Sequence, residues 1–337
     1  MLEKPSVTMK PISLPLQTLY AELAQQLQAS AERPTSLYNR EINGIPYVYG
    51  KRPVGTVRRD IFVGRADDPA VVERIALIEE ENTRAAARKE IVSTLRRAHV
   101  PAPVPALSHV LDAMSDAGLL RQAVLVGTAA YQCYPAPLGH MLPAAGLITQ
   151  DADIATASLA VTTDEKGETM ETILKRADPT FRGLPGLDPA ALPSHFRSAS
   201  GFVVDLLTPQ LRRTDTSPMA LPALAAGATP LQHLDWLIAD PIPAAVLHRS
   251  GIAVWIPQPA RFAVHKLIIA QKRGGDTTKR QKDLAQAKAL IAALKSADPF
   301  ALSDAFEEAA AKGATGRERP IRRSLAELGL APKHLLA

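Results

Sequence analysis

The chain of 337 residues carries 39 basic and 34 acidic side chains, a formal net charge of +5, and 46% of its residues are hydrophobic. This length favours two or three domains, and the hydrophobic content is enough to bury more than one core. A charge surplus this small argues against a dedicated nucleic-acid-binding protein, although it permits a polyanionic partner. Aromatic residues are scarce, at 4%, while Ala, Leu and Pro are plentiful, which favours helix-rich layers of the α/β or α+β class over an all-β sandwich.

The cysteine content and the length of the apolar runs indicate in which cellular compartment we expect the protein. The single cysteine, Cys133, cannot form an intramolecular disulfide, and the sequence opens without a charged-then-apolar leader. The longest apolar runs, such as residues 123–126 and 202–207, are as short as a strand and cannot cross a bilayer. We therefore expect a cytoplasmic protein that does not enter the membrane.

The first hundred residues predict a helix, a small antiparallel sheet and a second helix. Leucines spaced three and four apart predict a helix over residues 16–29. Asn43-Gly44 lies between residues 38–42 and 45–49 and predicts a β-hairpin with a type I′ turn. A third strand over residues 58–63 would bring arginines beside exposed tyrosines, which can contact nucleic acid or serve only in packing. A charged helix over residues 68–98 then ends before a proline-rich boundary near residue 104.

The next segment predicts a turn that can hold phosphate. A short helix over residues 106–117 ends at Gly118, and residues 123–126 read as a buried strand that leads into Gly127-Thr128. Glycine allows a bulky anion to approach the backbone, and the Thr128 hydroxyl adds a donor or a metal-facing oxygen. A Gly-Thr turn with a purely structural role is the alternative interpretation.

Two aspartates follow in a short predicted strand, Thr149-Gln-Asp151-Ala-Asp153-Ile154. Side chains two residues apart in a strand share one face, so both carboxylates point the same way. Like charges held so close raise each other's proton affinity, and a bound cation removes that penalty. Because magnesium prefers oxygen ligands and completes its shell with substrate phosphates, the pair predicts Mg²⁺ or Mn²⁺ together with a nucleoside triphosphate.

Asp205 interrupts the otherwise apolar run of residues 202–207. A charged side chain in a strand covered on both faces costs several kcal/mol unless a cation or a donor meets it. Three carboxylates from Asp151, Asp153 and Asp205 would suit two metal ions in nucleotidyl transfer, with Asp205 nearest the acceptor hydroxyl.

In this order the motifs resemble the nucleotidyltransferase-fold superfamily typified by DNA polymerase beta. Within it, the chain is similar to a bacterial family of uncharacterised proteins related to the nucleotidyltransferase toxins of abortive-infection systems. Gly-Thr replaces the superfamily's Gly-Ser, and a Pro-rich segment over residues 135–148 lengthens the gap before the two aspartates. The matching motifs are Val126-Gly127-Thr128-x-Ala130, Thr149-x-Asp151-x-Asp153-Ile154, Val204-Asp205-Leu206, Pro257-x-Pro259-x-x-Phe262-x-x-His265-Lys266-Leu267 and Lys282-Asp283-x-x-Gln286-Ala287.

The resemblance implies an α+β fold with a nucleotidyltransferase core, in which a mixed sheet is flanked by helices. It also implies that Lys266 and Asp283 assist catalysis, with Lys266 contacting the leaving pyrophosphate. On a predicted helix over residues 259–272, Lys266 has apolar neighbours one turn away, so it either extends outward or meets a buried anion such as triphosphate. Asp283 follows Lys279 and Arg280 by one turn, and a helix-surface ion pair is an equally good account of it.

The C-terminal part completes the predicted organisation. Residues 284–294 and 299–312 predict amphipathic helices, and a basic segment near the end reads as a solvated terminal helix or as an RNA-contacting tail. The basic residues are Arg317, Arg319, Arg322, Arg323 and Lys333. We expect three domains, over residues 1–104, 105–215 and 216–337. The histidines His140, His195, His233 and His248 show no metal-binding spacing and are interpreted as structural.

These observations support one leading hypothesis and one alternative. The leading hypothesis is a metal-dependent nucleotidyltransferase that moves a nucleoside monophosphate from an NTP such as ATP to a hydroxyl on an RNA end, such as that of tRNA, on a protein or on a small molecule. A toxin-like role is a biological variant of the same chemistry. The alternative is a binding module of the same fold that regulates a partner or a nucleic acid without turnover.

Overall fold

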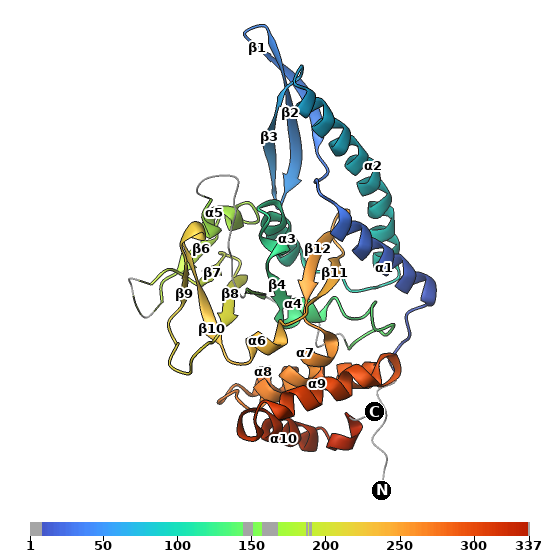
Figure 1. Ribbon diagram of the computed structural model, residues 1–337, viewed down its shortest axis with the longest axis vertical. Helices are drawn as coiled ribbons and strands as arrows, with labels where there is room; N and C mark the ends of the chain where they lie inside the picture. The colour runs from blue at the N-terminus through green and yellow to red at the C-terminus, as the bar shows by residue number, and fades with distance from the viewer. Residues whose placement is uncertain (1–8, 144–150, 157–167, 187, 189–190, 336–337) are drawn as a thin grey trace.

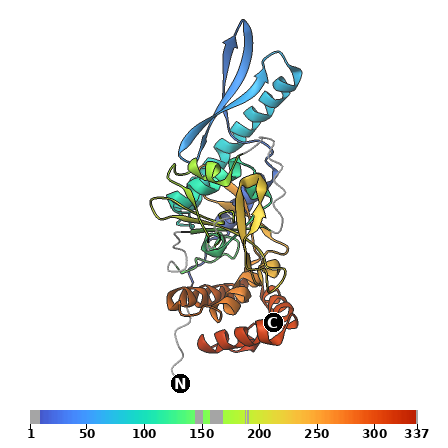
Figure 2. The ribbon, with the colours of Figure 1, turned by 90° about the vertical axis from the view of Figure 1, so that its left-hand side faces the viewer.

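The polypeptide forms three tiers in the computed structural model: an N-terminal arm, a central sheet and a group of C-terminal helices (Figures 1 and 2). The structure describes residues 9–143, 151–156, 168–186, 188 and 191–335. Thr149, Gln150 and residues 144–148 of the Pro-rich segment lie outside this part of the chain. The combination of a mixed sheet with segregated helices confirms the predicted α+β class.

The arm consists of a three-stranded antiparallel sheet and the long helix beside it (Figure 1). Its hairpin is confirmed, because Ile42 pairs with Ile45 and both turn residues, Asn43 and Gly44, have positive φ angles of 52° and 77°. One face of this sheet packs on the first half of the helix through a small apolar cluster. The elements are β1 (Ser36–Ile42), β2 (Ile45–Val54), β3 (Val57–Arg65) and α2 (Pro69–Arg97), and the cluster is Val48, Val63, Val71 and Ile78.

The second half of α2 belongs to a different apolar cluster. There Val92 and Leu95 pack with Leu23 and Tyr20 of α1 (Leu14–Ala29), the predicted N-terminal helix. The Tyr20 hydroxyl also donates to the Ala245 carbonyl oxygen at 3.0 Å. Helix α2 therefore begins in the arm and ends against the body of the molecule.

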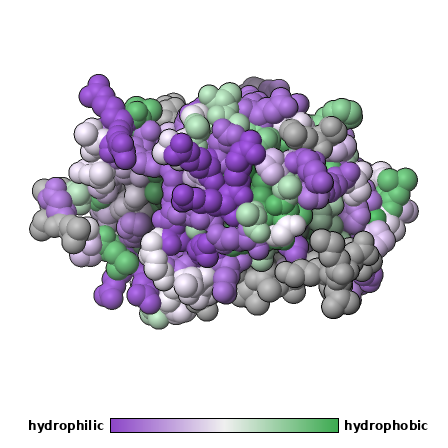
Figure 3. All heavy atoms as spheres, turned by 90° about the horizontal axis from the view of Figure 1, so that it is seen from below, coloured by the Kyte–Doolittle hydropathy of each residue, from purple (hydrophilic) through white to green (hydrophobic). Residues whose placement is uncertain are grey.

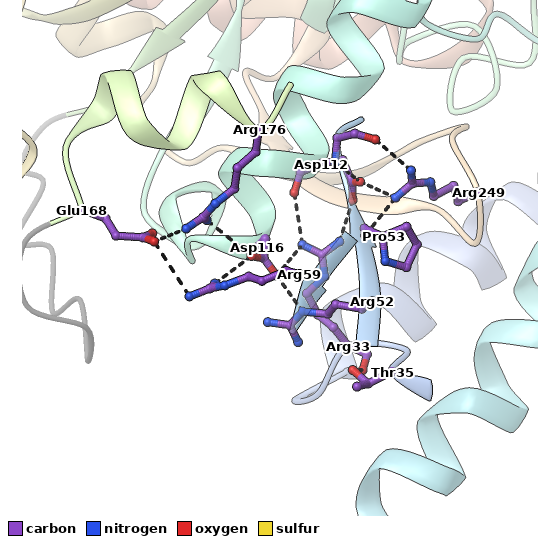
Figure 4. A network of polar contacts seen from close by, with 11 residues as sticks. Arg33, Thr35, Arg52, Pro53, Arg59, Asp112, Asp116, Glu168, Arg176 and Arg249 are labelled. Atoms are coloured by element: carbon purple, nitrogen blue, oxygen red, sulfur yellow. Dashed lines mark hydrogen bonds and ion pairs between the residues drawn. The ribbon is translucent and has the colours of Figure 1, made fainter. Parts of the chain in front are cut away.

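A buried ionic network joins the arm to the body (Figure 4). Asp112 and Asp116 lie on α3 (Pro105–Asp116), and their side chains are 2% and 0% exposed. The turn between β2 and β3 docks beside them, since the Gly55 amide donates to Asp112 Oδ2 at 2.8 Å. Five guanidinium groups surround the two carboxylates, from Arg33, Arg52, Arg59, Arg176 and Arg249. Because the arginines come from both the arm and the body, this network fixes where the arm attaches.

Within the described ranges, the central sheet has nine strands in the order β11-β12-β4-β5-β8-β10-β9, with β7 beside β8 and β6 beside β7. It is mixed, since β5 runs parallel to β8 and antiparallel to β4. Several of its strands follow residue 215, and the predicted domain boundaries stay a prediction. The strands are β4 (Val124–Val126), β5 (Asp151–Ala155), β6 (Arg182–Leu184), β7 (His195–Arg197), β8 (Val203–Pro209), β9 (Met219–Leu221), β10 (Ala226–Leu231), β11 (Ile242–Val246) and β12 (Ile252–Ile256).

Helices cover this sheet and continue into the lowest tier, where the predicted C-terminal helices are confirmed. Those associated with the sheet are α3, α4 (Gly127–Tyr131), α5 (Met170–Lys175) and α6 (Leu234–Leu237). Those of the lowest tier are α7 (Pro259–Ala270), α8 (Thr277–Ala297), α9 (Pro299–Ala311) and α10 (Arg319–Glu327). None of the helices in the described part of the chain combines the length and apolarity that a membrane span requires.

The face formed by the C-terminal helices is largely hydrophilic when seen from below (Figure 3). Arg319, Arg322 and Arg323 are exposed there. Arg317 departs from the expected solvated or RNA-contacting segment, because it is only 7% exposed and its guanidinium lies 5.4 Å from the centre of the Trp236 ring. Arg317 therefore packs inside the fold.

Candidate active site

Strand pairing brings the two predicted carboxylate motifs together. Asp153 lies opposite Val126 of β4 on one side and opposite Asp205 of β8 on the other. Asp151 is on the same face as Asp153 because side chains alternate along a strand. The opposite face of both strands is apolar and fully buried, at Ala152, Ile154, Val204 and Leu206. A shift of the strand register by one residue would move the apolar side chains to the face that carries the aspartates. Burial of the apolar face therefore fixes the register and keeps all three aspartates on the other face.

The two neighbouring carboxylates act on the pKa of Asp153. Burial, followed by the charges of Asp151 and Asp205, raises the pKa of Asp153 from 3.8 to about 6, while Lys266 and Arg273 act in the opposite direction. An aspartate with such a pKa is charged at pH 7 at an energetic cost. This is the environment in which a bound cation is favoured.

Gly127 lies against the same carboxylate. Its φ angle is +61°, and a Cβ atom added to it would stand 2.0 Å from Asp153 Oδ2. The following residue, Thr128, is 7% exposed at the start of α4. The Gly-Thr turn and the aspartates are thus in direct contact, as the order of motifs predicted, and glycine at position 127 is what allows Asp153 to point as it does.

Lys266 and Asp283 form a buried ion pair between α7 and α8. Lys266 Nζ lies 2.7 Å from Asp283 Oδ1, and the Arg273 Nε lies 3.0 Å from Asp283 Oδ2. Lys266 also lies over the Phe262 ring, with 5.2 Å between Nζ and the ring centre. Of the two positions expected for Lys266, the structure selects the buried one, with the Asp283 carboxylate as its anion.

The helix-surface interpretation of Asp283 is wrong. Its neighbours one turn earlier bind elsewhere: Arg280 pairs with Glu327, and Lys279 lies 4.0 Å from Asp276. Asp283 itself is 3% exposed and faces α7. The local spacing of charges suggested a pair along one helix, whereas packing between two helices decided the partner.

Two further residues belong to the candidate site although sequence reasoning gave them no role. His195 was interpreted as structural, yet its Nδ1 lies 2.6 Å from Asp205 Oδ1 because β7 pairs with β8 at this position. Lys282 is close enough to Asp151 and Asp153 for their charges to act on it, and burial lowers the pKa of its ammonium group. The adjacency of Lys282 to Asp283 was the available signal for the lysine, while the histidine depends on a cross-strand register that spacing does not reveal.

The donor set fits a hard divalent cation in its chemistry, since three carboxylates supply the oxygen ligands that Mg²⁺ and Mn²⁺ take. Within the described residues, no group of three or more His, Cys, Asp and Glu side chains is already arranged to hold a metal ion. Asp205 is hydrogen-bonded to His195 instead. A metal ion would therefore have to draw the carboxylates together, and their assignment as ligands is a proposal.

A family model described as nucleotidyltransferase matches residues 106–311, which includes the Gly-Thr turn, the three aspartates, Lys266 and Asp283. Neither the curated proteins nor the solved structures gave a match.

Proposed function

Because the chain belongs to the nucleotidyltransferase family, we propose that it transfers a nucleoside monophosphate from an NTP to a hydroxyl group at the end of an RNA, in a metal-dependent reaction. The observation that carries this proposal is that Asp151, Asp153 and Asp205 lie together on one face of the sheet beside Gly127. The raised pKa of Asp153 is the electrostatic consequence of this arrangement. The resemblance to abortive-infection toxins makes tRNA the first RNA to try.

The three aspartates are proposed to hold Mg²⁺ or Mn²⁺. A metal bound there would lower the pKa of the acceptor hydroxyl and stabilise the charge that develops on the leaving pyrophosphate. The absence of a side chain at Gly127 leaves the carboxylate face open, and Thr128 is proposed to donate its hydroxyl to a phosphate oxygen.

The reaction itself exchanges the phosphoanhydride bond between the α- and β-phosphates for a phosphoester bond to the acceptor. The acceptor oxygen bonds to the α-phosphorus, the bond to the β-phosphate breaks, and pyrophosphate leaves with the electron pair. Asp205 is proposed to take the proton of the acceptor hydroxyl, and its Oδ1 lies 2.6 Å from His195 Nδ1. In this proposal Lys266 offers its ammonium group to the pyrophosphate, and Asp283 with Arg273 keeps that group inside the fold.

The proposal is tested with purified protein, each NTP labelled at the α-phosphate, and total RNA and total protein as acceptors, with and without MgCl₂. We expect label in the RNA fraction, dependent on the divalent cation. Asp151→Asn should lower the transfer rate by about 100-fold or more, because it removes a proposed ligand, while the melting temperature changes little.

The exposed Asp304 on α9 provides the matched control. Asp304→Asn removes the same charge away from the site and should transfer label at the wild-type rate. Undiminished transfer by Asp151→Asn would contradict the assignment of the metal ligands. Binding of NTP without release of pyrophosphate, by the wild-type protein and with every acceptor fraction, would instead indicate a binding module.

A further inference from the structure

One face of the arm sheet presents aromatic rings to solvent. Strand pairing aligns Tyr38 of β1, Tyr49 of β2 and Phe62 of β3 in a row across the sheet, with Tyr47 beside it. The Tyr38 and Tyr49 rings are stacked with centres 5.7 Å apart, and Phe62 meets Tyr49 edge to face at 5.4 Å. Phe62 is 56% exposed, an unusual state for a large apolar side chain. We call these four aromatic residues and the charged residues around them the open face of the arm.

The opposite face of the same sheet explains why this one is open. Val48 and Val63 point the other way and pack on Val71 and Ile78 of α2. The aromatic row therefore contributes nothing to the small apolar core of the arm. A contiguous row of half-buried tyrosines and an exposed phenylalanine on the outer face of a sheet needs another explanation, and binding is the usual one.

The charged residues around the aromatic row indicate which class of partner this face can bind. Arg40, Lys51, Arg58 and Arg65 lie around the aromatic row, against Asp60 and Asp67. Lys51 Nζ stands 5.2 Å from the centre of the Tyr38 ring. With four basic side chains against two acidic ones, the open face of the arm is therefore aromatic and cationic.

From these contacts we infer that the open face of the arm binds single-stranded RNA, with unpaired bases stacked on Tyr38, Tyr49 and Phe62 and phosphates held by the surrounding arginines and lysine. Stacking on exposed sheet aromatics within a positive surface suits unpaired bases, because every base has an aromatic face and every nucleotide a charge. The inference rests on the proposed function in that the strand bound by the arm is the RNA acceptor of the transfer reaction.

Fluorescence anisotropy with a labelled 12-nucleotide single-stranded RNA, without NTP or metal, tests the inference. Phe62→Ala should weaken binding about tenfold or more, and Tyr49→Ala by a similar factor, since each removes a stacking surface. Phe62→Trp should retain most of the affinity. Arg58→Ala should weaken binding and also flatten the dependence of log Kd on log salt, because it removes a phosphate contact.

Phe300→Ala is the matched control, because Phe300 on α9 is a phenylalanine of even greater exposure, at 72%. It should bind RNA as the wild type does. Circular dichroism melts establish that each variant is folded. Equal affinity of Phe62→Ala and wild type, or equal affinity of the wild type for the single strand and for a duplex of the same length, would overturn the inference. A dimer in light scattering that Phe62→Ala dissociates would overturn it too, since a second copy would then cover the face.

The binding assay separates the two proposals. Asp151→Asn lies outside the arm and should bind the RNA normally while losing transfer. Loss of RNA affinity in Phe62→Ala without transfer by the wild type would leave the arm inference standing and reject the proposed function. Transfer to RNA by the wild type, together with unaltered RNA affinity in Phe62→Ala, would reject the arm inference and leave the proposed function standing.

Discussion

Two clusters of aspartates in this molecule differ in what surrounds them. Asp112 and Asp116, at the base of the arm, are enclosed by five guanidinium groups and already have their cations (Figure 4). At the candidate site, Asp151 and Asp205 raise the pKa of Asp153, and Lys266 and Arg273 only partly oppose them. The first arrangement stabilises the fold, whereas the second holds a charge imbalance that an external cation can relieve. Surrounding charge distinguishes a structural carboxylate from one available for chemistry.

The largest expected effect comes from breaking the arm-base cluster. Asp116→Asn should lower the free energy of unfolding by about 3–5 kcal/mol, because it removes a buried charge that four partly buried arginines share. Urea denaturation followed by circular dichroism measures this loss. Asp67→Asn removes an exposed ion pair with Arg65 and should leave the urea midpoint nearly unchanged. A similar small change for Asp116→Asn would show that its arginines do not depend on it.

Gly127→Ala tests the contact between the turn and the site. The added Cβ would overlap Asp153 Oδ2, and the φ of +61° disfavours any side chain. We expect a loss of about 1–2 kcal/mol from the backbone conformation alone, and a larger fall in transfer activity as Asp153 is displaced. Gly274→Ala is a control, since a Cβ there meets nothing within 4 Å. Unchanged transfer by Gly127→Ala would show that the position of Asp153 is not critical.

The remaining effect on stability has the opposite sign. The folded-state pKa of Asp153, about 6, exceeds its ordinary value of 3.8, so folding favours the protonated form and the stability gained from it is lost as pH rises through about 6. In EDTA at pH 7.5, Asp153→Asn should therefore stabilise the protein by about 1–3 kcal/mol, and at pH 5, between the two pKa values, the gain should fall to about half. Melting temperatures at the two pH values measure this difference. Destabilisation at pH 7.5 would contradict the like-charge description of the site.

Local sequence patterns predicted the secondary-structure elements and most of the candidate site. They did not reveal contacts between residues that lie far apart in the sequence. Three features depend only on adjacent residues, and each lies where its pattern predicted it. They are the Asn-Gly turn, the Gly-Thr turn and the alternation of Asp151 with Asp153. His195 and the true partners of Asp283 could not be found in this way, because they depend on β7 pairing with β8 and on α7 packing against α8. The arm-base network draws on distant segments for the same reason.

The continuous helix α2 has a mechanical consequence. Its first half packs with the arm sheet and its second half with α1, so one uninterrupted rod of 29 residues, about 44 Å long, spans both clusters. The arm sheet is held to the body a second time, where the Gly55 amide meets Asp112. Inserting or deleting one turn of α2 would therefore displace its first half by about 5 Å against the docked sheet, so the length of this helix has to match the sheet that it supports.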